Sequence, residues 1–155
     1  MYIAQSKLLP AIKAKGYDGV CYDWEMVGKG HSMEEFNRLM SQTKQLGLLN
    51  ILTTTAEGPH QWDASPKDAT GIDWDNIDYL APQLYDPNGE MYPNWRTYAD
   101  FWKGTDAIMS INNVTFIPPP SDKILWGVPP SQGPMVMARN GGAGYVEWCY
   151  TPKNV

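Results

Sequence analysis

The stretch that decides the fold is "GYDGVCYDWEMV", residues 16–27. It reads as a β-strand that follows a glycine and carries two acids, Asp23 and Glu25, at its end. Side chains two residues apart on a strand point to the same face, so the sequence predicts Cys21 and both acids on one face, with the Cβ atoms of the acids roughly 7 Å apart. Two carboxyl groups held so close in a partly dry pocket repel each other, which raises the proton affinity of one of them.

Strands and helices alternate along the rest of the chain. Such an order favours a parallel sheet covered by helices, either a closed barrel or an open α/β fold. A capping pattern at Ser32 and Glu35 and a terminal Gly47 mark the clearest helix. Beside the strand at 16–27, the predicted strands are 48–58, 77–86, 123–130 and 142–150. The predicted helices are 5–15, 31–47, 94–111 and 131–142, with one helical turn at 73–77.

Composition narrows the class of protein. The 155 residues carry 43% hydrophobic and 19% charged side chains, which predicts one globular domain over residues 1–155. The formal net charge of -5, without a Lys/Arg cluster, argues against nucleic acid as a partner. No stretch has the length of a membrane span, and the N-terminus lacks the order of a signal peptide. The localisation is left open.

Neither a metal nor a cofactor is expected. His31 and His60 are isolated, and each reads as a solvated loop residue. Cys21 and Cys149 lie in separate predicted strands and show no zinc-ligand spacing.

Polar and aromatic residues stand near the ends of the other predicted strands. Gln83 and Tyr85 share a face at the end of "APQLYD", and Trp148 lies near the end of "YVEWCY". Because parallel strands bring their carboxyl ends to one edge, these groups and the two acids are expected to form a sugar pocket. Paired acids suit hydrolysis of a glycosidic bond. Taken singly, the aromatic residues are more often core residues, and the acids more often mark a solvated strand end.

The sequence resembles the family 18 glycoside hydrolases, the chitinase family, over nearly its whole length. "DGVCYDWE" is similar to the family's signature strand, Asp-Gly-x-Asp-x-Asp-x-Glu, with Asp18, Gly19, Asp23 and Glu25 matching and Cys21 at the place of the first Asp of the run. "LTTTAEG", "QLYD" and "GGAGYVEW" resemble the fifth, sixth and eighth barrel strands. The Gln that precedes the Tyr in "QLYD", Gln83 before Tyr85, most resembles the hevamine-type members of the family.

The resemblance implies a substrate-assisted retaining reaction on β-1,4-linked N-acetylglucosamine glycans. Glu25 is then the general acid and base, and Asp23 orients the substrate acetamide. Tyr85 hydrogen-bonds the acetamide oxygen, and Trp148 stacks under the sugar. Gln83 and Asp86 hold the rim of the site, with Glu57 as a further rim candidate.

Two departures from the family pattern change the expected rate of the reaction and the expected extent of the barrel. In the family, the Asp at the place of Cys21 shares a proton with the middle Asp; a thiol donates weakly, so a lower rate is expected. A cysteine nucleophile is disfavoured, since no His lies in a matching motif. A closed (β/α)8 barrel takes about 200 residues or more, so the chain is expected to form an incomplete TIM-barrel with about strands 4 to 8.

An open sheet edge predicts association with other chains. The chain is then a piece of a larger enzyme, a truncated reading frame, or a homo-oligomer subunit that completes its sheet. Two other functions remain open: a chitinase-like carbohydrate-binding protein that has lost turnover, and a non-catalytic oligomerising scaffold.

Overall fold

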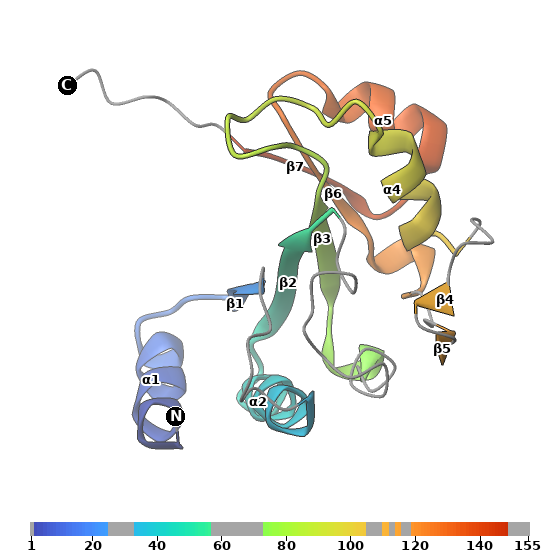
Figure 1. The fold of residues 1–155 in the computed structure, drawn as a ribbon. Helices are drawn as coiled ribbons and strands as arrows, with labels where there is room; N and C mark the ends of the chain where they lie inside the picture. The colour runs from blue at the N-terminus through green and yellow to red at the C-terminus, as the bar shows by residue number, and fades with distance from the viewer. Residues whose placement is uncertain are drawn as a thin grey trace.

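The computed structural model describes residues 2–24, 33–56, 73–104, 110–111, 114–115 and 119–148. Its central feature is a five-stranded sheet in the order β1-β2-β3-β6-β7, in which all neighbouring pairs are parallel (Figure 1). The predicted parallel sheet is confirmed. Its strands are β1 (Gly19–Trp24), β2 (Leu49–Thr55), β3 (Tyr79–Gln83), β6 (Leu125–Val128) and β7 (Gly144–Glu147).

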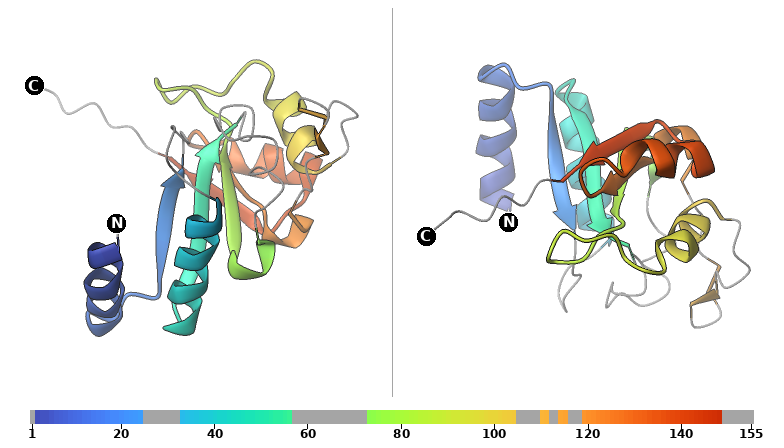
Figure 2. Two further views of the ribbon diagram at one scale, coloured as in Figure 1. Left: turned by 60° about the horizontal axis from the view of Figure 1, so that its bottom comes forward. Right: turned by 90° about the horizontal axis from the view of Figure 1, so that it is seen from above.

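Helices connect the strands and follow the predicted order. Figures 1 and 2 show α1 at one end of the molecule beside β1, and α5 at the other end beside β7. The bounds are α1 (Tyr2–Ala14), α2 (Met33–Gln45), η2 (Trp74–Asn76), α4 (Trp95–Trp102), η3 (Ser121–Lys123) and α5 (Gly133–Asn140).

One predicted helix is too long. The helix expected over 94–111 ends at Trp102, and Gly104 follows in the left-handed region with φ +69°. The Gly104 N–H donates to the Phe101 carbonyl, as at many glycine-terminated helices. Further along, β4 (Ser110–Ile111) pairs antiparallel with β5 (Val114–Thr115), so the helix prediction is wrong there.

The two faces of the sheet differ in burial. Asn50, Leu52 and Thr54 of β2 are buried, whereas the alternate residues Thr53 and Thr55 are only half-buried. The second face, called the open face here, carries Asp23 of β1, Thr53 and Thr55 of β2, Gln83 of β3 and Val146 of β7, as the strand registers show. Leu49 and Val146 on this face are 45% and 40% exposed, so the described residues leave part of it uncovered.

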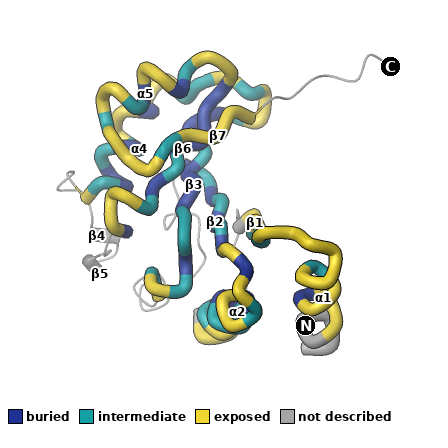
Figure 3. The backbone as a smooth tube through the Cα atoms, turned by 180° about the vertical axis from the view of Figure 1, so that it is seen from behind, coloured by how far each residue is buried: buried dark blue, intermediate teal, exposed yellow. Residues whose placement is uncertain are grey.

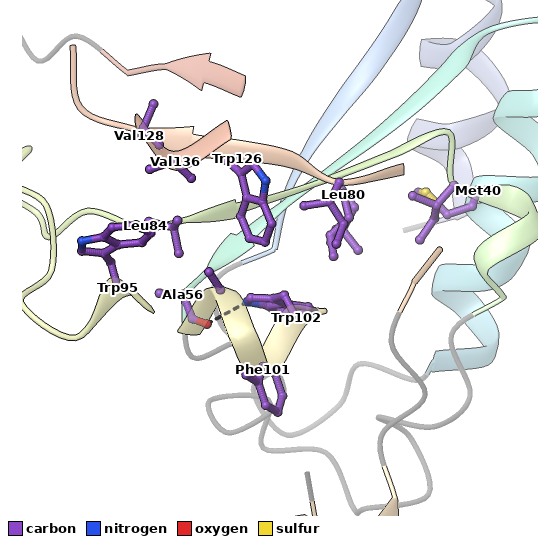
Figure 4. Packing of buried hydrophobic residues seen from close by; sticks show 14 of the residues in the cluster. Met40, Ala56, Leu80, Leu84, Trp95, Phe101, Trp102, Trp126, Val128 and Val136 are labelled. Carbon is purple, nitrogen blue, oxygen red and sulfur yellow. Dashed lines mark hydrogen bonds between the residues drawn. The ribbon is translucent and has the colours of Figure 1, made fainter. Parts of the chain in front are cut away.

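The core lies between the sheet and the helices that follow its strands. Buried residues concentrate along β3 and β6, while α1 is mostly exposed (Figure 3). Trp102 of α4 is fully buried, and its indole N–H donates to the Ala56 carbonyl at 2.8 Å (Figure 4). The cluster also contains Phe36, Met40, Leu52, Ile77, Leu80, Leu84, Trp95, Ala99, Phe101, Ile124, Trp126, Val128 and Val136.

Two strand contacts depend on glycine. A Cβ at Gly19 would lie 2.6 Å from the Leu49 carbonyl oxygen, and a Cβ at Gly127 would lie 2.9 Å from that of Pro82. Both are closer than a real Cβ contact allows, so these glycines permit the close approach of β1 to β2 and of β6 to β3. Gly127 pairs with Gln83 and therefore helps to place the end of β3.

Candidate functional site

A pocket of about 230 Å³ opens at the carboxyl ends of the parallel strands. It brings together five residues that the sequence singled out, because parallel strands direct their ends to a common edge. Glu25 and Glu57, which were also singled out, lie outside the described residues, as do His31, His60 and Cys149. The lining residues are Asp23, Thr55, Gln83, Tyr85, Asp86, Pro87, Gly89, Tyr92 and Trp148.

The acid of β1 is joined to the end of β3. The Gln83 side-chain amide donates to the Asp23 carboxylate, with Nε2 and Oδ1 3.3 Å apart. Cys21, two residues before Asp23, has its Sγ 3.0 Å from the Thr53 hydroxyl oxygen on β2. The thiol therefore has a hydrogen-bond partner on the neighbouring strand.

Two aromatic rings form one side of the pocket. Tyr85 and Trp148 stack with centroids 6.4 Å apart and an interplanar angle of 12°. Tyr85 is buried, whereas Trp148 is 53% exposed, and the Trp148 backbone N–H donates to the Val128 carbonyl at 3.0 Å. An indole held in this way offers a flat apolar surface to a ligand.

Asp86 organises the loop that follows β3. Its carboxylate accepts the backbone N–H groups of Asn88 and Glu90 at 2.9 Å each and the Asn88 side-chain amide at 3.2 Å. The hydrogen bond from the Glu90 backbone is the largest cause that lowers the pKa of Asp86, and those from Asn88 add to it against partial desolvation. The carboxylate of Asp86, a predicted rim residue, therefore accepts hydrogen bonds from its own turn.

This loop folds back along the chain that precedes it. Tyr92 N–H donates to the Leu84 carbonyl at 3.0 Å, and Tyr85 pairs antiparallel with Met91. The turn is thereby fixed as a wall of the pocket. Sequence reasoning missed its lining residues Pro87, Gly89 and Tyr92, and also Thr55 of β2.

Signals for these missed residues are present in the sequence. The dipeptide Asn88-Gly89 favours a tight turn, and Gly89 has φ +81°. Thr55 lies two residues after Thr53 on β2, and so on the same face.

The charge of the pocket limits its ligands. Its described lining residues include two carboxyl groups, Asp23 and Asp86, and no Lys or Arg. Such a lining is suited to neutral ligands or to developing positive charge. No group of three potential metal ligands occurs among the residues that the structure describes. Across the same part of the chain, no helix combines the length and apolar character needed to cross a membrane.

Comparison with known proteins identifies the fold. No family profile and no curated protein matches the sequence. Among solved structures, the chain is similar to the catalytic domain 2 of an Ostrinia furnacalis group II chitinase, an E2180L mutant in complex with penta-N-acetylchitooctaose, at 13% identity and a TM-score of 0.52. It is similar to a chitinase from Chromobacterium violaceum ATCC 12472 at 22% identity and a TM-score of 0.52.

A third similar structure is the spore cortex-lytic enzyme SleL of Bacillus megaterium QM B1551, at 13% identity and a TM-score of 0.51. The matches cover 83%, 81% and 79% of this chain but only 39%, 40% and 28% of the respective solved chains. The chain therefore spans about two fifths or less of these structures. The described sheet and helices have the fold of part of a TIM barrel, as the sequence predicted.

Proposed function

We propose that the chain forms one partial TIM-barrel domain of a glycoside hydrolase that cleaves β-1,4-linked N-acetylglucosamine glycans. The observation that carries the proposal is the shared pocket of Asp23, Tyr85 and Trp148, delivered from three different strand ends. A carboxylate, a phenol and an exposed indole suit a sugar that carries an acetamido group. The pocket also lies at the edge where active sites of TIM barrels are found.

The proposed reaction is substrate-assisted and retaining. Glu25 protonates the leaving glycosidic oxygen while the substrate's acetamido oxygen attacks the anomeric carbon, which gives an oxazolinium intermediate and breaks the glycosidic bond. Water then opens the intermediate, with Glu25 as the base that takes its proton. Asp23 orients the acetamide and balances the positive charge that develops on it.

The remaining lining residues hold the sugar. Tyr85 donates to the acetamide oxygen, and Trp148 stacks under the ring. Gln83 and Asp86 belong to the rim, Asp86 through the turn that its carboxylate fixes. Glu57 is a further rim residue. The chitooligosaccharide named in the Ostrinia structure supports this class of ligand.

The test compares two chromogenic glycosides. The chain is expected to release the chromophore from a chitotriose glycoside and not from the matching cellotriose glycoside, because a 2-hydroxyl group cannot replace the acetamide as internal nucleophile. The anomer formed first, followed by proton NMR, should have the configuration of the substrate. Equal rates on both glycosides, or an inverted product, would refute the substrate-assisted mechanism.

A second candidate is a chitinase-like carbohydrate-binding protein without turnover. The contact between Cys21 and Thr53 favours it, because a thiol engaged on the neighbouring strand supplies Asp23 with no carboxyl partner for a shared proton. Binding of chitotriose without any product over long incubation would support this candidate against the enzyme.

We also propose that further strands pair with the edges of β1 and β7 that no described strand occupies, as in a homo-oligomer that completes the sheet. The exposure of Leu49 and Val146 on the open face supports this. The mass in dilute solution checks it: a stable monomer with cooperative unfolding would speak against association.

A further inference from the structure

The Asp23 carboxylate accepts a hydrogen bond from a residue two strands away, Gln83. Asp23 lies on β1 and Gln83 at the end of β3, and β2 runs between them. Neighbouring strands are about 4.8 Å apart, so the backbones of β1 and β3 are separated by about 10 Å. The side chains close this distance, since Gln83 Nε2 lies 3.3 Å from Asp23 Oδ1.

The residues of β2 leave room for this contact. Thr53 pairs with Asp23, and Thr55 pairs with Gln83, so the contact runs diagonally over two threonines on the open face. Threonine is short, and the Thr53 hydroxyl is already turned toward Cys21. A long side chain at either position would obstruct the path between Gln83 and Asp23.

Cys21, two residues before Asp23 on β1, is not the donor that holds the Asp23 carboxylate. Cys21 shares the face of Asp23, but its Sγ lies 3.0 Å from the Thr53 hydroxyl oxygen. A thiol is also a weak hydrogen-bond donor. An amide N–H, in contrast, donates well and keeps its state at every working pH.

We propose that Gln83 is a positioning residue, which fixes the orientation of the Asp23 carboxylate and keeps it ionised by donating its amide N–H across β2. The proposal deepens the proposed function and rests on it for its role in catalysis. It changes the assignment of Gln83 from a rim residue that binds substrate to one that acts through Asp23. The donor cannot titrate, so Asp23 keeps its charge where a carboxyl partner would share a proton with it.

Few other titratable groups face the pocket. In the described part of its lining they are Asp86, whose carboxylate is bound by its own turn, and the phenols of Tyr85 and Tyr92. The proposed acid Glu25, two residues after Asp23 in the sequence, is a further titratable group of the proposed site. The Cys21 thiol lies on the same face of the sheet. A change in the titration of Asp23 on substitution of Gln83 can therefore be followed against a small set of neighbours.

The test is a ¹³C NMR titration of the Asp23 side-chain carboxyl in the full chain, which needs no turnover. Gln83→Met removes the donor at similar length, and the midpoint is expected to rise by about half to one pH unit. Gln83→Glu replaces the donor by a like charge and should raise the midpoint further. Gln45→Met, at the exposed end of α2, is the matched control and should leave it unchanged.

Kinetics on the chitotriose glycoside add a second readout. Both Gln83 variants should lower kcat about tenfold or more with little change in KM, and in Gln83→Glu the acid limb of the pH profile should move upward. In Gln83→Met, which adds no charge, a residue that only binds substrate would instead raise KM and leave the Asp23 midpoint in place, and this result would overturn the inference. If the parent chain binds but does not hydrolyse, a shifted midpoint still upholds the positioning contact, while the proposed function fails.

Discussion

Replacing Glu25 with Gln is expected to lower kcat for the chitotriose glycoside by about 10²–10⁴-fold, the usual contribution of a general acid and base. Gln has nearly the same shape but cannot give a proton to the leaving oxygen or take one from water. Binding should persist, because Asp23, Tyr85 and Trp148 still line the pocket. Initial rates give the loss of kcat, and quenching of tryptophan fluorescence by chitotriose gives the affinity.

The control is Glu34→Gln, which makes the same chemical change at an exposed residue of α2. It should leave both rate and affinity at the level of the parent chain. If Glu25→Gln and the parent chain hydrolyse the glycoside equally fast, Glu25 is not the acid and the proposed mechanism is wrong.

Replacing Trp102 with Ala is expected to reduce the free energy of unfolding by about 3–5 kcal/mol, as for other large aromatic core residues. The Trp102 side chain is fully buried, and its ring meets that of Phe101 edge-on, with centroids 5.3 Å apart. The substitution leaves a cavity and also removes the donor to the Ala56 carbonyl just after β2. Urea unfolding, followed by circular dichroism, measures the change.

Two further variants separate the causes. Trp102→Phe fills most of the space without the indole N–H, so it should cost less than the Ala variant. Trp148→Ala truncates an exposed indole and should change the unfolding free energy by less than about 1 kcal/mol while weakening chitotriose binding. Equal destabilisation by Trp102→Ala and Trp148→Ala would contradict the burial that separates these two residues.

The fold was predictable where its signals are local. The alternation around Asp23 and the run of strands and helices predicted the parallel sheet, because these patterns depend on side-chain period alone. The helix over 94–111 was overextended, since its aromatic residues end at Trp102 and Gly104 ends the helix through its backbone conformation. The short β4 and β5 strands carry too few residues for a periodic signal.

The site was predictable in its strand-end residues and not in its loop. Asp23, Tyr85 and Trp148 follow from strand periodicity and the family resemblance. Tyr92 enters the pocket only because the turn at Asp86 folds back on the chain before it. The contact of Asp23 with Gln83 joins residues 60 positions apart, and no local pattern encodes it.

The pocket draws on both outermost strands of the sheet. Asp23 comes from β1 and Trp148 follows β7, at opposite ends of the strand order. Outer strands fray at a lower free energy than the centre of a sheet. Ligand affinity should consequently be the first property to decline on mild heating or in dilute urea, while the tryptophans of the interior still report a native environment.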